Sequence, residues 1–292
     1  MTHHAADRLL HACDTKGAPV CVGLDPVLEK LPAAVREAYD QPVDALEVFC
    51  YGVLDAVKEL VPAVKPQIAC FERYGSAGYA AYERVVAAAV NAGLCVVADC
   101  KRGDIGTSSA HYAAGLITGG DTWKGGDFLT VNSYLGTDGI EPFFDAAEAA
   151  GAGLFALVRT SNSGGDALQG LRLDDGRTVA EAVADQVAAL GQRSVGERGY
   201  SLLGAVVGAT KPADAVALRK RMPQQIFLVP GYGAQGGGAD DVRACFNSDG
   251  AGALITASRS VIYAPAAGDG SWTDAVQAAA QTLRDEIASI LR

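Results

Sequence analysis

The chain has 292 residues, of which 49% are hydrophobic and 20% charged, and its formal net charge is −10. This composition is typical of a soluble globular protein, and the acidic excess argues against nucleic acid and anionic membranes as partners. Seven cysteines without a C-x-x-C pair, and four histidines without metal-ligand spacing, predict a reduced, cytoplasmic protein without a metal site. We expect no signal peptide and no membrane span.

Apolar runs rich in β-branched residues alternate along the chain with alanine-rich stretches of helical spacing. The apolar runs predict eight strands, at residues 20–24, 63–68, 95–98, 128–131, 154–158, 202–207, 226–229 and 253–256. The other stretches predict helices at residues 45–60, 78–92, 111–117, 140–150, 179–190, 212–220, 240–245 and 272–291.

Regular alternation of strands and helices predicts a parallel sheet, and eight strands favour a closed (β/α)8 TIM barrel over an open sheet. We expect a single domain over residues 1–292, because no linker or repeat divides the chain. A barrel gathers the C-terminal ends of its strands at one face, where its active site lies. The irregular stretch 159–177 predicts either a mobile loop over that face or a tolerated insertion, and we favour the loop.

The most informative motif is Asp-Cys-Lys-Arg-Gly-Asp-Ile-Gly at residues 99–106, which follows the apolar run 94–98. That run is typical of a buried parallel strand, so the charges emerge where the strand ends. Asp99 and Lys101 are two residues apart, so on an extended backbone both side chains point to the same face. Charges gathered beside a buried strand are costly, and they indicate either a catalytic site or a salt-bridged strand end.

A second motif, Gly-Tyr-Gly-Ala-Gln-Gly at residues 231–236, matches G-x-G-x-x-G and follows the predicted seventh strand. Too little chain remains for a dinucleotide-binding domain, so we interpret the segment as the loop after barrel strand seven. In barrels the loops after strands seven and eight frequently bind phosphate. Backbone N–H groups of the glycine loop and the guanidinium of Arg259 predict such a site. The alternative is a plain glycine turn beside a surface arginine.

Together these residues resemble the orotidine 5′-phosphate decarboxylase family, in its longer bacterial (type 2) subgroup, over nearly the whole chain. The most specific match is the D-x-K-x-x-D-I motif at Asp99, Lys101, Asp104 and Ile105. Residues 65–72, 134–136, 160–162 and 230–237 also look like that subgroup, although Ser133 replaces an expected proline and Ser258 a frequent glycine. The resemblance implies decarboxylation of orotidine 5′-monophosphate to UMP and CO₂, the last step of de novo UMP biosynthesis, without a cofactor.

The resemblance also implies roles for individual residues. Lys101 would protonate the pyrimidine carbon that loses CO₂, Asp99 would lie near the departing carboxylate, and Asp104 would reach into the partner's active site in a homodimer with shared active sites. The implied catalytic residues are Lys101, Asp99, Asp104 and Lys65. The implied substrate-binding residues are Asp25, Lys65, Ile105, Ser108 (or Thr107), Ser161, Gln235 and Arg259. The implied phosphate loop comprises Gly233, Gln235, Gly236, Ser258 and Arg259.

Two other functions remain open at this point. A Mg²⁺-dependent phosphosugar decarboxylase or aldolase on the same barrel would need an extra acidic ligand near the second strand, for which Glu72 is the candidate. A non-catalytic barrel that binds a phosphorylated ligand would keep Gln235 and Arg259 but would not need the Asp-Lys-Asp array. Neither alternative accounts as well for the charged motif combined with the strand-seven loop.

Overall fold

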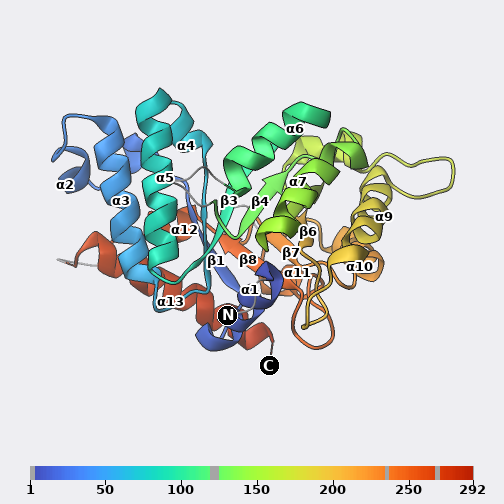
Figure 1. Cartoon of the computed structure of the whole chain (residues 1–292). Helices are drawn as coiled ribbons and strands as arrows, with labels where there is room; N and C mark the ends of the chain where they lie inside the picture. The colour runs from blue at the N-terminus through green and yellow to red at the C-terminus, as the bar shows by residue number, and fades with distance from the viewer. Residues whose placement is uncertain (1–3, 119–124, 234–236, 267–269, 292) are drawn as a thin grey trace.

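Eight parallel strands close into a barrel in the computed structural model, which describes residues 4–118, 125–233, 237–266 and 270–291 (Figure 1). Each strand pairs with the next one along the chain, and β8 pairs with β1 to close the sheet. The predicted (β/α)8 TIM barrel is therefore confirmed. The strands are β1 (Val20–Leu24), β2 (Ala63–Pro66), β3 (Cys95–Arg102), β4 (Phe128–Val131), β5 (Gly153–Arg159), β6 (Leu203–Val207), β7 (Phe227–Pro230) and β8 (Ala253–Ala257).

Helices surround the barrel, with α3, α5 and α13 grouped on one side and α6, α7, α9 and α10 on the other (Figure 1). The longer helices are α1 (Ala5–Lys16), α3 (Pro42–Val57), α5 (Gly75–Asn91), α6 (Gly106–Ala113), α7 (Thr137–Ala150), α9 (Val179–Gly191), α10 (Pro212–Arg221) and α13 (Trp272–Ile290). Shorter helices and turns are η1 (Leu28–Lys30), α2 (Ala33–Arg36), α4 (Ala69–Glu72), η2 (Ala114–Thr118), η3 (Ser163–Gly165), α8 (Asp166–Gln169), η4 (Gln192–Ser194), α11 (Ala239–Arg243) and α12 (Arg259–Ile262).

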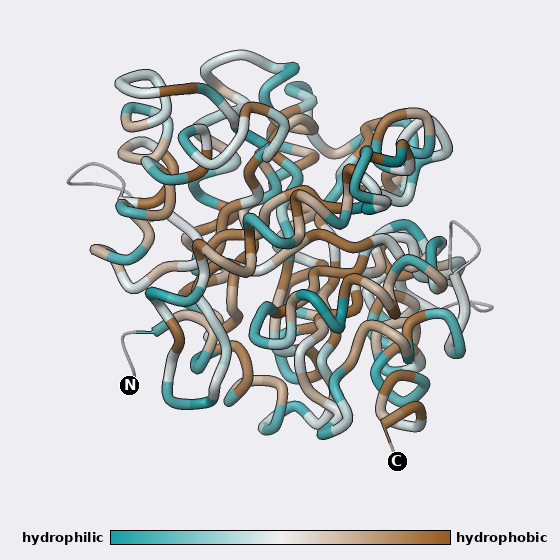
Figure 2. The backbone as a smooth tube through the Cα atoms, turned by 90° about the vertical axis from the view of Figure 1, so that its right-hand side faces the viewer, coloured by the Kyte–Doolittle hydropathy of each residue, from teal (hydrophilic) through white to brown (hydrophobic). Residues whose placement is uncertain are grey.

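The strands are apolar in continuous runs because the barrel interior covers one face and the helices cover the other. Every residue of β1, β2, β4, β6 and β8 is buried. The rings of Phe128 and Phe155, from neighbouring strands, stack with centroids 4.9 Å apart. Figure 2 shows the hydrophobic stretches of the chain gathered at the centre of the molecule and the hydrophilic ones at its periphery.

Helix α1 has no counterpart among the predicted elements. It buries Ala5, Leu9, Leu10 and Cys13, and Figure 1 shows it below the barrel, at the end where the strands begin. Its apolar face is narrow, because polar and charged residues separate these positions in the sequence. The helix closes the barrel end opposite to the one where an active site is expected.

Helix α6 begins at Gly106 and not at the predicted residue 111. Glycine and serine have low helix propensity, which hid this start in the sequence. The side chain of Ser109 donates a hydrogen bond to the Asp104 carbonyl and so supports the first turn. Thr107 and Ser108 consequently lie on the exposed first turn of α6 and not on a loop.

Candidate active site

Asp99 is the centre of a charged array at the C-terminal end of the barrel. Its Oδ2 accepts a hydrogen bond from Lys65 Nζ at 2.7 Å, and its Oδ1 accepts one from Lys101 Nζ at 2.5 Å. Lys65 Nζ also lies 3.8 Å from Oδ1 of Asp25. The members come from three neighbouring strands, since Asp25 follows β1, Lys65 lies on β2, and Asp99 and Lys101 lie on β3. The structure thus brings together four of the predicted site residues.

Burial and pairing act in opposite directions on this array. Burial alone would raise the pKa of Asp99, but the ammonium groups of Lys65 and Lys101 together lower it to about 2. Burial alone would lower the pKa of Lys65, yet the Asp99 and Asp25 carboxylates raise it above its usual value. The two carboxylate partners of Lys65, Asp99 and Asp25, therefore keep it charged at neutral pH, and Asp99 remains a carboxylate.

Lys101 differs from Lys65 in its access to solvent. The Lys101 side chain is 47% exposed, whereas those of Lys65 and Asp99 are 7% exposed. The expectation of an extended backbone here is wrong, because Lys101 has φ +47°, the one positive φ at a non-glycine residue in the part of the chain that the structure describes. The side chain still reaches Asp99, so the strained backbone aims the ammonium group back over the array.

Two residues of the array were missed in the sequence. Gln67 Nε2 donates to Asp99 Oδ2 at 3.0 Å, and Thr130 Oγ1 donates to Asp99 Oδ1 at 3.1 Å. Thr130 is the polar residue of the otherwise apolar strand β4, and this was the sequence feature that could have pointed to it. Its β-branched side chain is nevertheless ordinary in a strand, so the signal is weak.

A cavity of about 140 Å³ connects this array to the predicted phosphate end. Its lining residues are Asp25, Lys65, Gln67, Asp99, Pro230, Gly231, Tyr232, Thr256, Ser258 and Arg259. A Cβ on Gly23 would lie 1.8 Å from Oγ of Ser258, so only glycine lets β1 approach the segment after β8 this closely. The cavity is therefore lined by two carboxylates (Asp25 and Asp99), one ammonium group (Lys65) and one guanidinium group (Arg259).

Other predicted site residues lie outside this cavity. Asp104 Oδ1 accepts the N–H of Ile105, whose side chain is exposed, and Ser108 is exposed on α6. The carbonyl of Ser161 accepts a hydrogen bond from Thr210 at 3.0 Å. Gly233, with φ +69°, is described and exposed, whereas Gln235 and Gly236 lie outside the described residues.

The first part of the segment 159–177 is held in place by ion pairs of Arg159. Arg159 is buried, and its guanidinium donates to Asp214 at 2.7 Å and to Asp166 on α8. Beyond α8, a bridge between Arg172 and Thr178 forms a hairpin that projects outward beyond α9 (Figure 1). Movement of this segment over the site stays a prediction.

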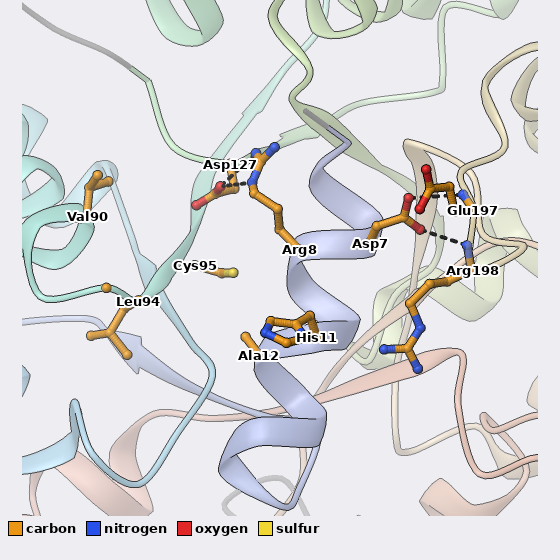
Figure 3. A pocket seen from close by; sticks show the side chains of 11 residues that line it. Asp7, Arg8, His11, Ala12, Val90, Leu94, Cys95, Asp127, Glu197 and Arg198 are labelled. Carbon is orange, nitrogen blue, oxygen red and sulfur yellow. Dashed lines mark hydrogen bonds and ion pairs between the residues drawn. The ribbon is translucent and has the colours of Figure 1, made fainter. Parts of the chain in front are cut away.

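A larger pocket, of about 730 Å³, lies at the opposite end of the barrel (Figure 3). Three of its charged groups have partners: Arg8 pairs with Asp127 at 2.8 Å, and Asp7 accepts the N–H groups of Glu197 and Arg198 at 3.0 Å each. The remaining walls are largely apolar, including Val90. The charge array therefore places the candidate active site at the smaller cavity.

Comparison with known proteins gives a consistent result. Residues 18–280 match the model of the orotidine 5′-phosphate decarboxylase / HUMPS family. The chain is 44% identical to an orotidine 5′-phosphate decarboxylase of Rhodopirellula baltica, covering 93% of this chain and 94% of that protein. It is 42% identical to one of Deinococcus radiodurans, covering 92% and 91%. A crystal structure from Streptomyces avermitilis described by the same activity superposes with a TM-score of 0.84 at 37% identity, covering 99% of this chain and 96% of that one.

Proposed function

Because the chain belongs to the orotidine 5′-phosphate decarboxylase / HUMPS family, we propose that it converts orotidine 5′-monophosphate to UMP and CO₂, the last step of de novo UMP biosynthesis, without a metal or cofactor. The relatives at 42–44% identity carry that activity in their names. The observation that carries the proposal is the Lys65–Asp99–Lys101 array at the mouth of the barrel.

Fixed charge is what this reaction requires. When the bond to the carboxylate breaks, its electron pair remains on the pyrimidine carbon in an orbital that the ring cannot delocalise. An ammonium group about 4 Å from such an anion contributes about 4 kcal/mol at an effective dielectric constant of about 20. Lys101 is the exposed ammonium of the array, so we assign to it the stabilisation of this anion.

Lys101 then completes the reaction by giving a proton from Nζ to the carbon, and it regains a proton from solvent. Asp99 would hold the Lys101 ammonium in place and lie near the departing carboxylate. Asp25 and Lys65 would bind the ribose hydroxyls, in accordance with their place on the cavity wall. Ile105, Ser108 and Ser161 would complete the nucleoside site, as the family resemblance implies.

The phosphate would bind at the other wall of the cavity, which Ser258 and Arg259 line. Arg259 is exposed and begins α12, so its guanidinium is accessible to a bidentate anion. Gly233, Gln235 and Gly236 would add N–H and amide donors from the loop after β7. Because the phosphate is remote from the reacting carbon, its binding energy can be used to close the site around the transition state.

The decisive test is UMP formation from orotidine 5′-monophosphate by the purified protein in excess EDTA, with Lys101→Ala assayed beside it. We expect turnover by the wild type and a loss of at least about 10³-fold in the variant. Turnover of a phosphosugar only after Mg²⁺ is restored would contradict the proposal and favour the alternative lyase. The alternative lyase would need Glu72 as its additional acidic metal ligand, but Glu72 forms an ion pair with Arg102.

We also propose that two copies of the chain share their active sites. Four exposed apolar side chains, those of Ile105, Tyr112, Tyr134 and Leu135, lie on α6 and in the segments just before α6 and α7. The segments before α6 and α7 are neighbours in space, because Gly139 lies against both Leu135 and the Asp104 carbonyl. Exposed apolar patches of this kind mark interfaces, and a second copy here would bring its Asp104 toward the neighbouring site.

Mixing two inactive variants tests this arrangement. Lys101→Ala and Asp104→Ala subunits, combined and allowed to exchange, should regain about a quarter of the wild-type activity, because half of the sites in mixed dimers are intact. A mixture that stays inactive while both variants dimerise would contradict the shared site without affecting the assigned reaction.

The reduced state of the chain supports a cytoplasmic location. All seven cysteines are free, and six of them are buried. Thiols persist in reducing compartments, whereas oxidising ones favour disulfides. No helix in the described part of the chain is long and apolar enough to cross a membrane. A nucleotide and a second copy of the chain are the partners that we propose.

A further inference from the structure

The pairing of β3 with β4 is interrupted beside the charged array. Ala98 pairs with Leu129 and Arg102 pairs with Val131, so β3 advances by four residues while β4 advances by two. Such a bulge leaves N–H groups of the longer strand without partners in the sheet ladder. Buried N–H groups without a partner are costly, so another acceptor is needed.

The hydroxyl of Thr130 is that acceptor. Its Oγ1 accepts the N–H of Cys100 at 3.0 Å and the N–H of Lys101 at 2.9 Å. The same hydroxyl donates its proton to Asp99 Oδ1 at 3.1 Å. A hydroxyl has one proton and two lone pairs, so these three bonds use its full capacity. Thr130 is 1% exposed, which leaves water little access to replace it.

These contacts fix the positions of both Lys101 and Asp99. The bond to the Lys101 N–H holds the residue whose backbone is in the left-handed region, a conformation that a lysine adopts only at an energetic cost. The bond to Asp99 orients the same carboxylate oxygen that Lys101 Nζ contacts. With Gln67 and Lys65 on Oδ2, the carboxylate then accepts four hydrogen bonds and has a fixed orientation.

We propose that Thr130 is a positioning residue of the reaction: its hydroxyl builds the bulge of β3 and so aims the Lys101 ammonium group at the substrate. The inference rests on the proposed function for the reaction that Lys101 serves. Misplacing a reacting group by about 1 Å can cost about 10²-fold in rate. Thr130 would therefore affect the catalytic step and have little effect on binding, since it does not line the cavity.

The test compares Thr130→Val, which keeps the shape and loses the hydroxyl, with Thr130→Ser, which keeps the hydroxyl. For decarboxylation we expect kcat to fall about 10²-fold in Thr130→Val with KM within about threefold of the wild type, and to return to within about threefold of it in Thr130→Ser. Ser201→Ala is the matched control. Ser201 is a buried residue before β6 whose hydroxyl donates to the Gly191 carbonyl and accepts the Leu203 N–H, so its loss should reduce stability and leave kcat unchanged.

Amide hydrogen exchange provides a readout that does not depend on turnover. In folded Thr130→Val the Cys100 and Lys101 N–H groups should exchange at least about tenfold faster than in the wild type and in Thr130→Ser. Wild-type kcat or unchanged exchange in Thr130→Val would overturn the inference. If Thr130→Val does not fold, Thr130→Ala removes the same hydroxyl and is judged by the same results. A wild type without decarboxylase activity would overturn the proposed function instead, and the exchange rates would still decide the role of Thr130 at Lys101.

Discussion

Both ends of the barrel bury charged side chains, but they use them differently. At the C-terminal end, Asp99 and Lys65 pair with each other, and Lys101 presents an ammonium group to solvent beside them. At the N-terminal end, Asp7 accepts two backbone N–H groups, and Arg219 donates to the backbone carbonyls of Cys245, Gly252, Gln225 and Met222. At the N-terminal end, the charged groups of Asp7 and Arg219 thus bind backbone N–H and carbonyl groups.

This difference shows that a buried charge does not by itself indicate an active site. Arg219 is as buried as Lys65, and burial lowers its pKa to about 10. Its guanidinium also lies 3.8 Å from the centroid of the Phe227 ring, which adds a cation–π contact. What distinguishes the catalytic end is that its charged groups pair with one another through their side chains: Lys65 and Asp99 line a cavity, and Lys101 beside them stays half exposed.

The difference between the two ends is tested most strongly by Asp99→Asn, which keeps the shape of the side chain and removes its charge. Lys65 would retain only Asp25, at 3.8 Å, as a carboxylate near its ammonium group. We expect a loss of about 3–5 kcal/mol in the free energy of unfolding, because an incompletely paired charge stays buried. The kcat should fall at least about 10³-fold, since Lys101 also loses its anchor.

Chemical denaturation and initial rates of UMP formation measure both effects of Asp99→Asn. Loss of stability together with an unchanged kcat would show that Asp99 serves only as a structural counter-ion, as Arg219 and Asp7 have structural roles at the other end.

Arg219→Met should produce the opposite combination. Methionine fills much of the same volume but leaves the backbone carbonyls of Cys245 and Gln225 without this buried donor. We expect the free energy of unfolding to fall by about 3 kcal/mol, with kcat and KM close to the wild type at a temperature where the variant is folded. Denaturant melts and steady-state kinetics on the same preparation check this. A drop in kcat of more than about tenfold would mean that the two ends are coupled.

The sequence predicted the C-terminal end better than the N-terminal end, for a physical reason. Lys65, Asp99 and Arg259 follow or end apolar runs, and in a parallel barrel all such positions converge on one face. Arg219 binds backbone carbonyls, and no side-chain pattern in the sequence reveals such partners. Thr130 was missed because a threonine in a strand is ordinary, and its importance depends on a bulge that the sequence does not show.

Low pH should weaken the pairing at the C-terminal end and not the contacts of Arg219, and the expected loss of unfolding free energy is smaller than in the two variants above. The pKa of Asp99 is lowered from 3.8 to about 2 in the folded chain, so its contribution to stability is present above pH 3.8 and is lost as the pH falls through about 2. The shift corresponds to about 2 kcal/mol. The free energy of unfolding should therefore fall by that amount between pH 4 and pH 2 in the wild type and in Arg219→Met, beyond the fall seen in Asp99→Asn. Equal slopes in all three proteins would contradict the assigned Lys65 and Lys101 pairing.

The smallest expected effect belongs to Asp7→Asn on α1. The Asn amide keeps one oxygen acceptor, so one of the two N–H groups that Asp7 binds, those of Glu197 and Arg198, stays satisfied. The loss comprises one hydrogen bond to a charged acceptor and a favourable charge in the first helical turn, in total about 2 kcal/mol. Thermal melts should show a decrease of a few degrees, while kcat stays at the wild-type value. If Asp7→Asn reduced kcat as Asp99→Asn does, the charges that close the N-terminal end would also determine the geometry of the catalytic end, and the distinction between the two ends would fail.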